Sequence, residues 1–595
     1  MNIKERINAL RQQMHDKNID VYLVPSADNH QSEYVGEHFK SRAFITGFTG
    51  SAGTAVITMD KAGLWTDGRY FIQAEKELVG SDIDLYRMGN PCVPTVDEFL
   101  DTVLPQNGTL GFDGRVISMQ EGKRYKEKFL YKNVQLEDRY DLIDSIWTDR
   151  PAMSAHPVFV LEEKYSGEST ASKLSRIRDK MKELGATAHL LITLDDIAWL
   201  LNLRGRDVEY TPVVLSYAII MMDCVHLFIN ENKLSEQVRD TLAKDQVIIH
   251  PYNDVYEFTA SLAASEVVLI DPARLNYTLY NCIPANIKRV EATNPALLFK
   301  SIKNEIEIKN IKKAHAKDAV AHTKFLYWLK TTYKKETITE LSASDKLEAL
   351  RAEQDNFLWP SFEPISAYGA HAAMCHYSSS EETNAVLEGG TLYLTDTGGN
   401  YMEGSTDITR TIALGEISNE LKRDFTNVLR GNLALSKAKF IYGCSGQNLD
   451  ILARQYLWNE YQDYNHGTGH GVGYLLSVHE PACRFSWKSV EEAKRPLEHG
   501  MIITDEPGIY VEDSHGIRCE NELLVCKDIK NEYGQFMRFE VLTFVPFDLD
   551  AIEPSLLNED EKIQLNAYHK NVYDIVAPHL KDDERKWLKE YTRAI

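Results

Sequence analysis

Five side chains that can bind divalent cations occur in five separate segments of the C-terminal half of the chain. They are two aspartates, one histidine and two glutamates: Asp396, Asp407, His470, Glu506 and Glu520. Carboxylate oxygens with one imidazole are ligands that suit a pair of divalent cations. Four carboxylates that converge without a cation would repel one another strongly. The need to bring these five segments together around a pair of cations is therefore the main constraint on the fold of this chain.

The sequence around the four acidic residues predicts a strand or the end of one. Asp396 follows an apolar segment and precedes the turn signal Gly398-Gly399. A hairpin to Asp407 would therefore place both carboxylates at one end of a sheet. Glu506 ends a predicted strand, and Glu520 is expected in the middle of another.

The histidine of the set belongs to the glycine-rich segment His466–Gly473, whose backbone can approach a ligand closely. Oxygen ligands with one imidazole favour Mn²⁺, with Zn²⁺, Co²⁺ or Fe²⁺ as alternatives. A water that bridges two such cations is a hydroxide near neutral pH and can attack a carbonyl carbon. The competing interpretation is a set of solvent-exposed acids at strand ends. For any single residue this interpretation explains the sequence as well as a metal site does. It explains poorly why all five residues occur together.

Composition excludes several other classes of protein. A net charge of −22 argues against nucleic acid as a partner, because phosphate binding needs a basic surface. The longest apolar stretch, residues 213–229, is too short and too interrupted by polar side chains to span a membrane. The N-terminus has no apolar core of a signal peptide, and the eight cysteines show no C-x-x-C spacing. We therefore expect a cytoplasmic protein.

A chain of 595 residues is too long for one hydrophobic core. Strands and helices alternate through the first half, which predicts two α/β domains. The order of elements is the same in both, so the second is interpreted as a duplicate of the first. An α+β domain with all five ligands follows, and then a segment that begins with a strand at Val541–Pro546 and ends in a helical tail packed on the catalytic domain. The predicted boundaries are 1–155, 156–298, 299–540 and 541–595.

Several blocks of the sequence together resemble the creatinase/methionine-aminopeptidase family of metallopeptidases, whose catalytic domain has the pita-bread fold. The blocks around the ligands are Leu394–Gly398, Ser405–Thr411, His466–Gly473, Thr504–Gly508 and Gly516–Glu522. Further blocks are Phe44–Thr54, Trp65–Phe71, Asp195–Gly205, Phe539–Thr543 and Leu565–His569. As a set they are most similar to the three-domain Xaa-Pro aminopeptidases. The resemblance implies two creatinase-type N-terminal α/β domains followed by a pita-bread catalytic domain.

The resemblance also implies a role for each metal ligand. Asp396 would hold one cation, and Asp407 and Glu520 would bridge the two. His470 and Glu506 would complete the coordination of the second cation. The implied reaction is hydrolysis of the N-terminal Xaa-Pro bond of a peptide, with the metal-bridging hydroxide as nucleophile.

Three further histidines and three slot residues follow from the same resemblance. His376 would contact substrate and shuttle protons, His466 would line the site, and His479 would donate to the scissile carbonyl. Residues implied to shape the slot for the proline ring are Phe362, Tyr510 and Arg518. The sequence departs from the family after His479, where it reads Glu480-Pro481-Ala482 instead of Glu-Gly-Pro, so this loop is expected to follow a different course.

Two alternative functions stay open from the sequence. One is a prolidase, which cleaves only Xaa-Pro dipeptides, although prolidases usually carry one N-terminal domain and not two. The other is a non-catalytic relative that uses the same fold as a binding module, although such relatives have typically lost the metal ligands. For the enzyme, the resemblance implies a homodimer and peptide substrates with proline in the second position.

Overall fold

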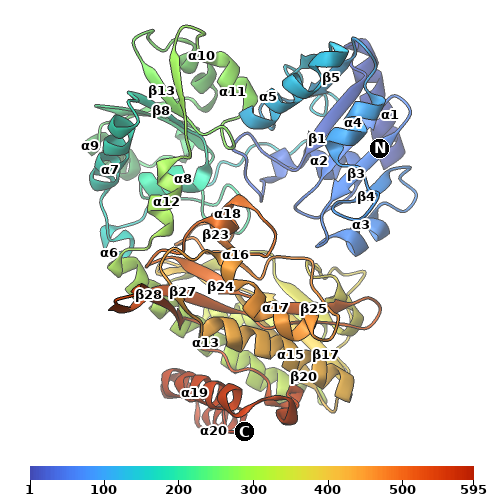
Figure 1. The fold of residues 1–595 in the computed structure, drawn as a ribbon, viewed down its shortest axis with the longest axis vertical. Helices are drawn as coiled ribbons and strands as arrows, with labels where there is room; N and C mark the ends of the chain where they lie inside the picture. The colour runs from blue at the N-terminus through green and yellow to red at the C-terminus, as the bar shows by residue number, and fades with distance from the viewer. The chain divides into compact units, whose positions relative to one another are not determined.

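The structure is a computed structural model that describes residues 1–595, and the chain divides into two compact units. Unit 1 comprises residues 1–162 and 168–297, and unit 2 comprises residues 163–167 and 298–595. In Figure 1 the strands of unit 1 are coloured from blue to green, and those of unit 2 from yellow to red. No helix in either unit combines the length and the apolar composition that crossing a membrane requires.

The first half of unit 1 is a six-stranded mixed sheet with helices against it. Its strand order is β4-β3-β2-β1-β5-β6. The strands are β1 (Val21–Pro25), β2 (Thr54–Thr58), β3 (Ala62–Thr66), β4 (Asp84–Arg87), β5 (Thr109–Phe112) and β6 (Gln135–Glu137). The helices are α1 (Ile3–Asp16), α2 (Ser41–Thr46), α3 (Phe71–Glu77), α4 (Val96–Val103) and α5 (Met119–Lys128). A capping box between Asn2 and Glu5 begins α1, which buries Ile7, Leu10 and Met14.

The second half of unit 1 contains a sheet of the same design. Its order is β12-β11-β10-β8-β13-β14, and each neighbouring pair has the same direction as the corresponding pair of the first sheet. The strands are β8 (Ala188–Leu191), β10 (Ser216–Met221), β11 (Val225–Ile229), β12 (Val247–His250), β13 (Val267–Ile270) and β14 (Lys288–Glu291), and β7 (Phe159–Val160) pairs separately with β9 (Leu203–Arg204). The helices are α7 (Thr170–Glu183), α8 (Leu194–Leu200), α9 (Glu236–Lys244), α10 (Val255–Ala260) and α11 (Tyr277–Cys282), and α12 (Pro295–Ser301) runs from unit 1 into unit 2.

Unit 2 is built from antiparallel sheets covered by helices. Its main sheets have the orders β16-β17-β20 and β21-β28-β27-β24-β22-β23, and two smaller ones are β15-β18-β19 and β25-β26. The strands are β15 (Phe357–Pro360), β16 (Ile365–Tyr368), β17 (Thr391–Thr397), β18 (Gly399–Tyr401), β19 (Gly404–Ser405), β20 (Ile408–Leu414), β21 (Lys439–Ile441), β22 (Gly469–Gly471), β23 (Glu480–Phe485), β24 (Ile502–Asp505), β25 (Gly508–Val511), β26 (His515–Arg518), β27 (Asn521–Asn531) and β28 (Gly534–Val541). The helices are α6 (Glu163–Ser166), α13 (Glu305–Thr332), α14 (Glu340–Ala352), α15 (Asn419–Ser436), α16 (Gly446–Leu449), α17 (Ile451–Trp458), α18 (Glu491–Lys494), α19 (Glu559–Val576) and α20 (Asp582–Tyr591).

Alternation along the central strand β17 gives the three-stranded sheet two buried faces. Tyr393 packs into a core formed with α13, α14, α19 and α20, whereas the neighbouring Leu392 packs into a separate core with α15. Successive side chains of a strand point to opposite faces, so one strand contributes to both cores. A sheet buried on both sides holds its strand ends rigidly, and one of those ends carries Asp396.

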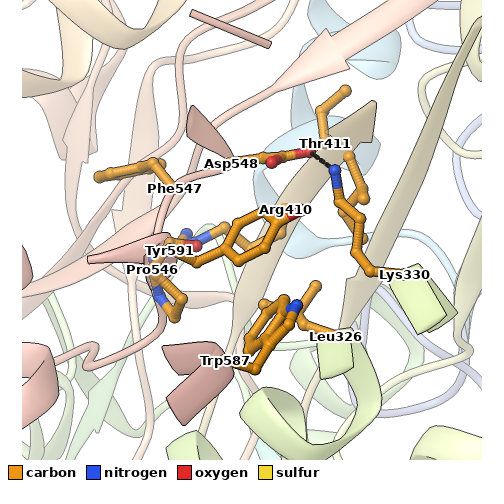
Figure 2. A pocket seen from close by; sticks show the side chains of 10 residues that line it. Leu326, Lys330, Arg410, Thr411, Pro546, Phe547, Asp548, Trp587 and Tyr591 are labelled. Atoms are coloured by element: carbon orange, nitrogen blue, oxygen red, sulfur yellow. Dashed lines mark hydrogen bonds and ion pairs between the residues drawn. The ribbon is translucent and has the colours of Figure 1, made fainter. Parts of the chain in front are cut away.

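The C-terminal segment packs against the rest of unit 2, and a buried ion pair is part of this contact. Lys330 of α13 pairs with Asp548 at 2.6 Å beside a pocket that Trp587 and Tyr591 of α20 help to line (Figure 2). The prediction of a strand at Val541–Pro546 is wrong, because β28 ends at Val541. Side chains take the place of a partner strand: the Tyr568 hydroxyl donates to the Val545 carbonyl at 2.6 Å, and a guanidinium of β20 donates to the same oxygen.

Two buried histidines make the stability of unit 2 depend on pH. Burial lowers the pKa of His322 and that of His569 to about 3. In an unfolded chain both would titrate at about 6.5. Below about pH 6.5 the unfolded state therefore binds protons that the folded state does not bind. Their contribution to stability is complete above this pH and is lost progressively as the pH falls toward 3.

We expect the variant His322→Leu to show a weaker loss of stability between pH 6.5 and 4 than the wild type. The slopes should differ by up to about 1.4 kcal/mol per pH unit, the value for one titrating group. Urea unfolding at a series of pH values measures this difference. His15→Leu, at an exposed histidine, is the control and should keep the wild-type slope. Equal slopes for the wild type and His322→Leu would contradict the prediction.

Candidate metal centre and active site

Asp396 and Asp407 lie at the same end of two paired strands. β17 and β20 are antiparallel neighbours in which Asp396 faces Thr409, and Asp407 immediately precedes β20. The connection between them is longer than a tight hairpin, because it contains β18 and β19. The backbone N–H of Asp407 donates to Glu522 Oε1 at 2.7 Å, which fixes the start of β20. The expected proximity of the two aspartates is therefore observed.

His470 and Glu506 come from the six-stranded sheet. His470 lies in β22, and Glu506 follows the neighbouring β24. The His470 Nδ1 lies 3.0 Å from the Gly471 carbonyl oxygen and can donate to it, so Nε2 is the nitrogen that would offer its lone pair to a metal. That Nε2 lies 3.6 Å from Asp407 Oδ2 and 3.5 Å from Glu506 Oε1. The lone pair of the imidazole and two carboxylates therefore meet at one place.

Glu520 joins the two sheets. Glu520 lies between β26 and β27, whereas the sequence predicts it in the middle of a strand. Its backbone N–H donates to the Thr409 carbonyl oxygen of β20 at 3.2 Å and not to the β25–β26 hairpin. The Thr409 hydroxyl donates to Glu520 Oε2 at 2.7 Å. Ligand atoms of Asp407, His470 and Glu520 all lie within 4.8 Å of one another, a spacing at which they could hold a metal ion.

The electrostatics of this cluster fit a cation. Burial, together with the charges of neighbouring carboxylates, raises the pKa of Asp407 and that of Glu520 well above their usual values. Burial also raises the pKa of Glu506 to about 7. Asp396 accepts from the Arg518 guanidinium at 2.5 Å through Oδ2, whereas its buried Oδ1 has no hydrogen-bond partner. An unpaired carboxylate oxygen among repelling carboxylates is what a bound cation would satisfy.

The three predicted catalytic histidines lie in different surroundings. His466 Nδ1 contacts the Gly467 carbonyl at 2.7 Å, and Nε2 accepts from the Tyr510 hydroxyl at 2.8 Å. Burial and the charge of Arg518 lower the pKa of His466 well below its usual value, so this imidazole is neutral. The ring of His479 packs edge-on against the ring of His470, with centroids 4.3 Å apart. His479 therefore contacts the cluster through His470, and His466 Nδ1 lies 4.0 Å from Glu506 Oε2.

Two of the three slot residues, Arg518 and Tyr510, contact each other, and the backbone just before His376 contacts the same guanidinium. Arg518 donates to the Tyr510 hydroxyl at 2.7 Å and to the Cys375 carbonyl at 3.4 Å, and His376 is the next residue along the chain. Phe362 lies half-buried in the connection between β15 and β16. It makes neither a ring contact with Tyr510 nor a cation–π contact with Arg518, so the structure does not join it to this pair.

Two residues that orient the cluster were not predicted from the sequence. Thr409 contacts Glu520 through its hydroxyl, which also accepts from Arg518 Nε at 3.1 Å. Glu522 accepts from the Asp407 backbone and lies 3.2 Å from His315 Nε2. Each lies two positions after a predicted ligand, on the same face of an extended segment. That alternation is the signal that could have found them.

Thr409→Val should weaken cation binding about 10- to 100-fold, as is usual when a partner that orients a metal ligand is removed. Valine keeps the shape of threonine but cannot donate to Glu520. Calorimetric titration of the metal-free protein with Mn²⁺ measures the change. The matched control is Thr323→Val, because the Thr323 hydroxyl is buried in α13 without a hydrogen-bond partner. Equal affinities for both variants would show that the Thr409 hydroxyl has no orienting effect.

Asp407, His470 and Glu520, with Asp396 and Glu506 beside them, form a buried cluster that could hold a metal ion. Comparison with known families agrees. Residues 309–527 match the metallopeptidase family M24, and residues 535–595 match the C-terminal region of peptidase M24. Residues 6–146 and 149–307 each match a creatinase/prolidase N-terminal domain. The chain belongs to the metallopeptidase family M24. The expected fold class, two creatinase-type domains before a pita-bread catalytic domain, is confirmed.

Relatives of similar length match the whole chain. Aminopeptidase P2 of Arabidopsis thaliana is 38% identical, and the alignment covers 100% of this chain and 89% of the relative. A probable Xaa-Pro aminopeptidase P of Leptosphaeria maculans is 37% identical, with 99% and 98% covered. The crystal structure of an X-prolyl aminopeptidase from Caenorhabditis elegans, described as a cytosolic enzyme with a di-nuclear active site, superposes with a TM-score of 0.96 at 34% identity and covers both chains completely.

Proposed function

We propose that this chain hydrolyses the bond between the first residue of a peptide and a proline in the second position. The chain is then an Xaa-Pro aminopeptidase, a metal-dependent exopeptidase. The observation that carries the proposal is the convergence of Asp407, His470 and Glu520, with Asp396 and Glu506 beside them, in a chain that matches aminopeptidases P over its full length. Its substrates are peptides with proline second.

The five ligands would hold two divalent cations. Asp396 would bind one cation, Asp407 and Glu520 would lie between the two, and His470 and Glu506 would complete the second. The donor set favours Mn²⁺, with Zn²⁺, Co²⁺ or Fe²⁺ as alternatives. When bound, such a pair supplies a hydroxide near neutral pH for attack on the scissile carbonyl. The unpaired Asp396 Oδ1 and the raised pKa values of Asp407 and Glu520 support this assignment.

The remaining polar side chains would orient substrate and move protons. His479 would donate to the scissile carbonyl oxygen, and His376 would contact the substrate and transfer a proton to the leaving proline nitrogen. Burial and the charge of Arg518 keep His466 neutral, and its hydrogen bond with Tyr510 orients the ring. Arg518, which holds both Tyr510 and Asp396, would form one wall of the proline slot. Phe362 would form another wall.

Proline in the second position explains why a dedicated site is needed. An Xaa-Pro bond has no amide N–H, and the ring fixes φ at about −65°. A peptidase that must hydrogen-bond this N–H would bind such a substrate poorly. A site that instead offers a slot for the ring and a proton for the leaving nitrogen selects for it. The assignment of Tyr510 and Arg518 to this slot is part of the proposal.

The same proposal includes the organisation of the chain. Domains would comprise residues 1–155, 156–298, 299–540 and 541–595, with the second a duplicate of the first, as the shared order of their sheets supports. A homodimer would bury some of the exposed aromatic side chains of unit 2, such as Trp458, Tyr461 and Trp487. Sedimentation of the 67.8 kDa chain would distinguish a monomer from a dimer. A cytoplasmic location agrees with the acidic composition and with the scattered cysteines.

Incubation of the Mn²⁺-loaded protein with three peptides tests the proposed function. Mass spectrometry should find free arginine released from Arg-Pro-Pro, with no cleavage of Arg-Ala-Pro. Cleavage of an Xaa-Pro dipeptide alone, with the tripeptide intact, would instead indicate a prolidase. No cleavage of any peptide, with no bound metal, would indicate a binding module and overturn the proposal.

A further inference from the structure

The segment that departs from the family pattern directly follows a buried carboxylate, that of Glu480, next to His479. Glu480 is 2% exposed, and it accepts from Lys303 Nζ at 2.6 Å and from Lys300 Nζ at 3.2 Å. Both lysines are also buried. Burial alone would raise the pKa of Glu480, but the charges of Lys303 and Lys300 outweigh burial and lower it. Three fully buried charges are thus concentrated one residue from a proposed catalytic histidine.

The backbone connects Glu480 directly to the metal cluster. Glu480 is the first residue of β23 and faces Gly471 of β22, which is the residue after His470. A Cβ on Gly471 would lie 2.6 Å from the Glu480 carbonyl oxygen, so the two strands approach closely here. The ring of His479 lies against the ring of His470. A shift of Glu480 would therefore move His479 relative to the metal ligand.

Pro481 is compatible with this arrangement. β23 is the edge strand of its sheet, and its pairing with β22 is irregular between His470 and Gly471. An edge strand or a bulge is where a sheet accepts proline, because no ladder donor is needed there. The Pro481 carbonyl accepts from Arg495 at 2.9 Å. The unusual sequence after His479 thus forms a strand whose start is held by ion pairs.

We propose that Lys300 and Lys303, through the carboxylate of Glu480, are positioning residues that hold His479 in its place against the metal cluster. This inference rests on the proposed function, because it takes from it the role of His479. In this role neither lysine acts on substrate directly, because each acts through its ion pair with Glu480. The lysines affect the reaction by fixing the position of the His479 side chain. An error of about 1 Å in such a group can reduce turnover about 100-fold.

The test compares two chemically matched substitutions in the full-length, Mn²⁺-loaded enzyme. Lys303→Met removes one buried partner of Glu480, and Lys233→Met removes the buried partner of Asp207 in unit 1, also at 2.6 Å. We expect Lys303→Met to lower kcat for Arg-Pro-Pro about 10- to 100-fold with KM within about twofold and two metals retained. Lys233→Met should leave kcat within about twofold at a temperature at which both variants are folded. Lys303→Arg, which keeps the charge, should recover most of the activity.

A double-variant cycle separates positioning from a general structural effect. If Lys303 acts through His479, adding Lys303→Met to His479→Gln should lower kcat no further. Three results would overturn the inference while the wild type still cleaves Arg-Pro-Pro. The first is a kcat of the double variant that falls by the combined losses of the two single variants. The others are a similar loss of kcat in Lys233→Met and an unchanged kcat in Lys303→Met. A wild-type enzyme that does not cleave this peptide would overturn the proposed function and this inference with it. The two failures are therefore distinguishable.

Discussion

Replacing Asp407 with asparagine is expected to reduce kcat/KM for Arg-Pro-Pro by about 10³-fold or more. Asparagine has the shape of aspartate but lacks the charge that would bind both cations. A bound cation is worth several kcal/mol of transition-state stabilisation, and each 1.4 kcal/mol is a factor of about ten in rate. The cluster places Asp407 Oδ2 only 3.6 Å from His470 Nε2, at the centre of the ligand set.

The same substitution should have the opposite effect on the metal-free protein. Without cations, the buried Asp407 carboxylate is disfavoured by burial and by its acidic neighbours, which raise its pKa. Removing it should therefore increase the free energy of unfolding of the metal-free enzyme at pH 7, while the stabilisation by added Mn²⁺ becomes smaller. Thermal unfolding with and without Mn²⁺ measures both. A lower stability of the metal-free variant would mean that Asp407 serves structure and not metal binding.

Asp424→Asn is the matched control for this experiment. Asp424 is also a buried aspartate of unit 2, but it lies on α15 and contacts His515 at 3.2 Å. It should keep kcat/KM within about threefold of the wild type and should leave the response to Mn²⁺ unchanged. An equal loss of activity in Asp424→Asn would show that any buried carboxylate is sensitive and would remove the special role of Asp407.

Arg410→Met should have the largest effect on stability among these variants, about 3–5 kcal/mol, because each buried carbonyl left without a donor costs about 1–3 kcal/mol. Arg410 is 1% exposed. Its guanidinium donates to carbonyls of the C-terminal segment at Val545 and Pro546, and to the Glu520 carbonyl. It also stacks over the Phe547 ring at 4.3 Å, beside the pocket of Figure 2. Methionine would fill part of the space but would leave these carbonyls unpaired.

Urea unfolding measures the loss, and metal titration measures its consequence for the site. Because Arg410 holds the backbone of Glu520, the variant should also bind Mn²⁺ more weakly than the wild type. Arg423→Met, at a half-exposed arginine of α15, is the control and should change the free energy of unfolding by less than about 1 kcal/mol. A similarly small change in Arg410→Met would contradict the view that this side chain replaces a partner strand for residues 542–546.

The candidate metal ligands could be named from the sequence, whereas the residues that contact and orient them could not. Asp396, Asp407, His470, Glu506 and Glu520 stand out as a set, although each acid alone could equally be a solvent-exposed residue at the end of a strand. The structure brings Asp407, His470 and Glu520 within ligand distance of one another, with Asp396 and Glu506 beside them. Their metal roles stay a prediction until metal is measured.

The orienting partners depend on contacts between residues far apart in the chain. Lys303 and Glu480 form an ion pair across 177 positions, and no local pattern in the sequence links them. For the same reason the segment 542–546 was predicted as a strand, since its composition fits one. Only the structure shows that Arg410 and Tyr568 satisfy its backbone instead. Local propensity is overridden here by tertiary hydrogen bonds.

One titration tests most directly that two cations at this cluster carry out Xaa-Pro hydrolysis. Metal-free enzyme at a concentration well above the dissociation constant is titrated with Mn²⁺, and release of arginine from Arg-Pro-Pro is measured at each addition. Activity should rise from the baseline and reach its plateau at two Mn²⁺ per chain, with no plateau in Asp407→Asn. A plateau at one equivalent, or activity that does not depend on added metal, would contradict the two-cation account.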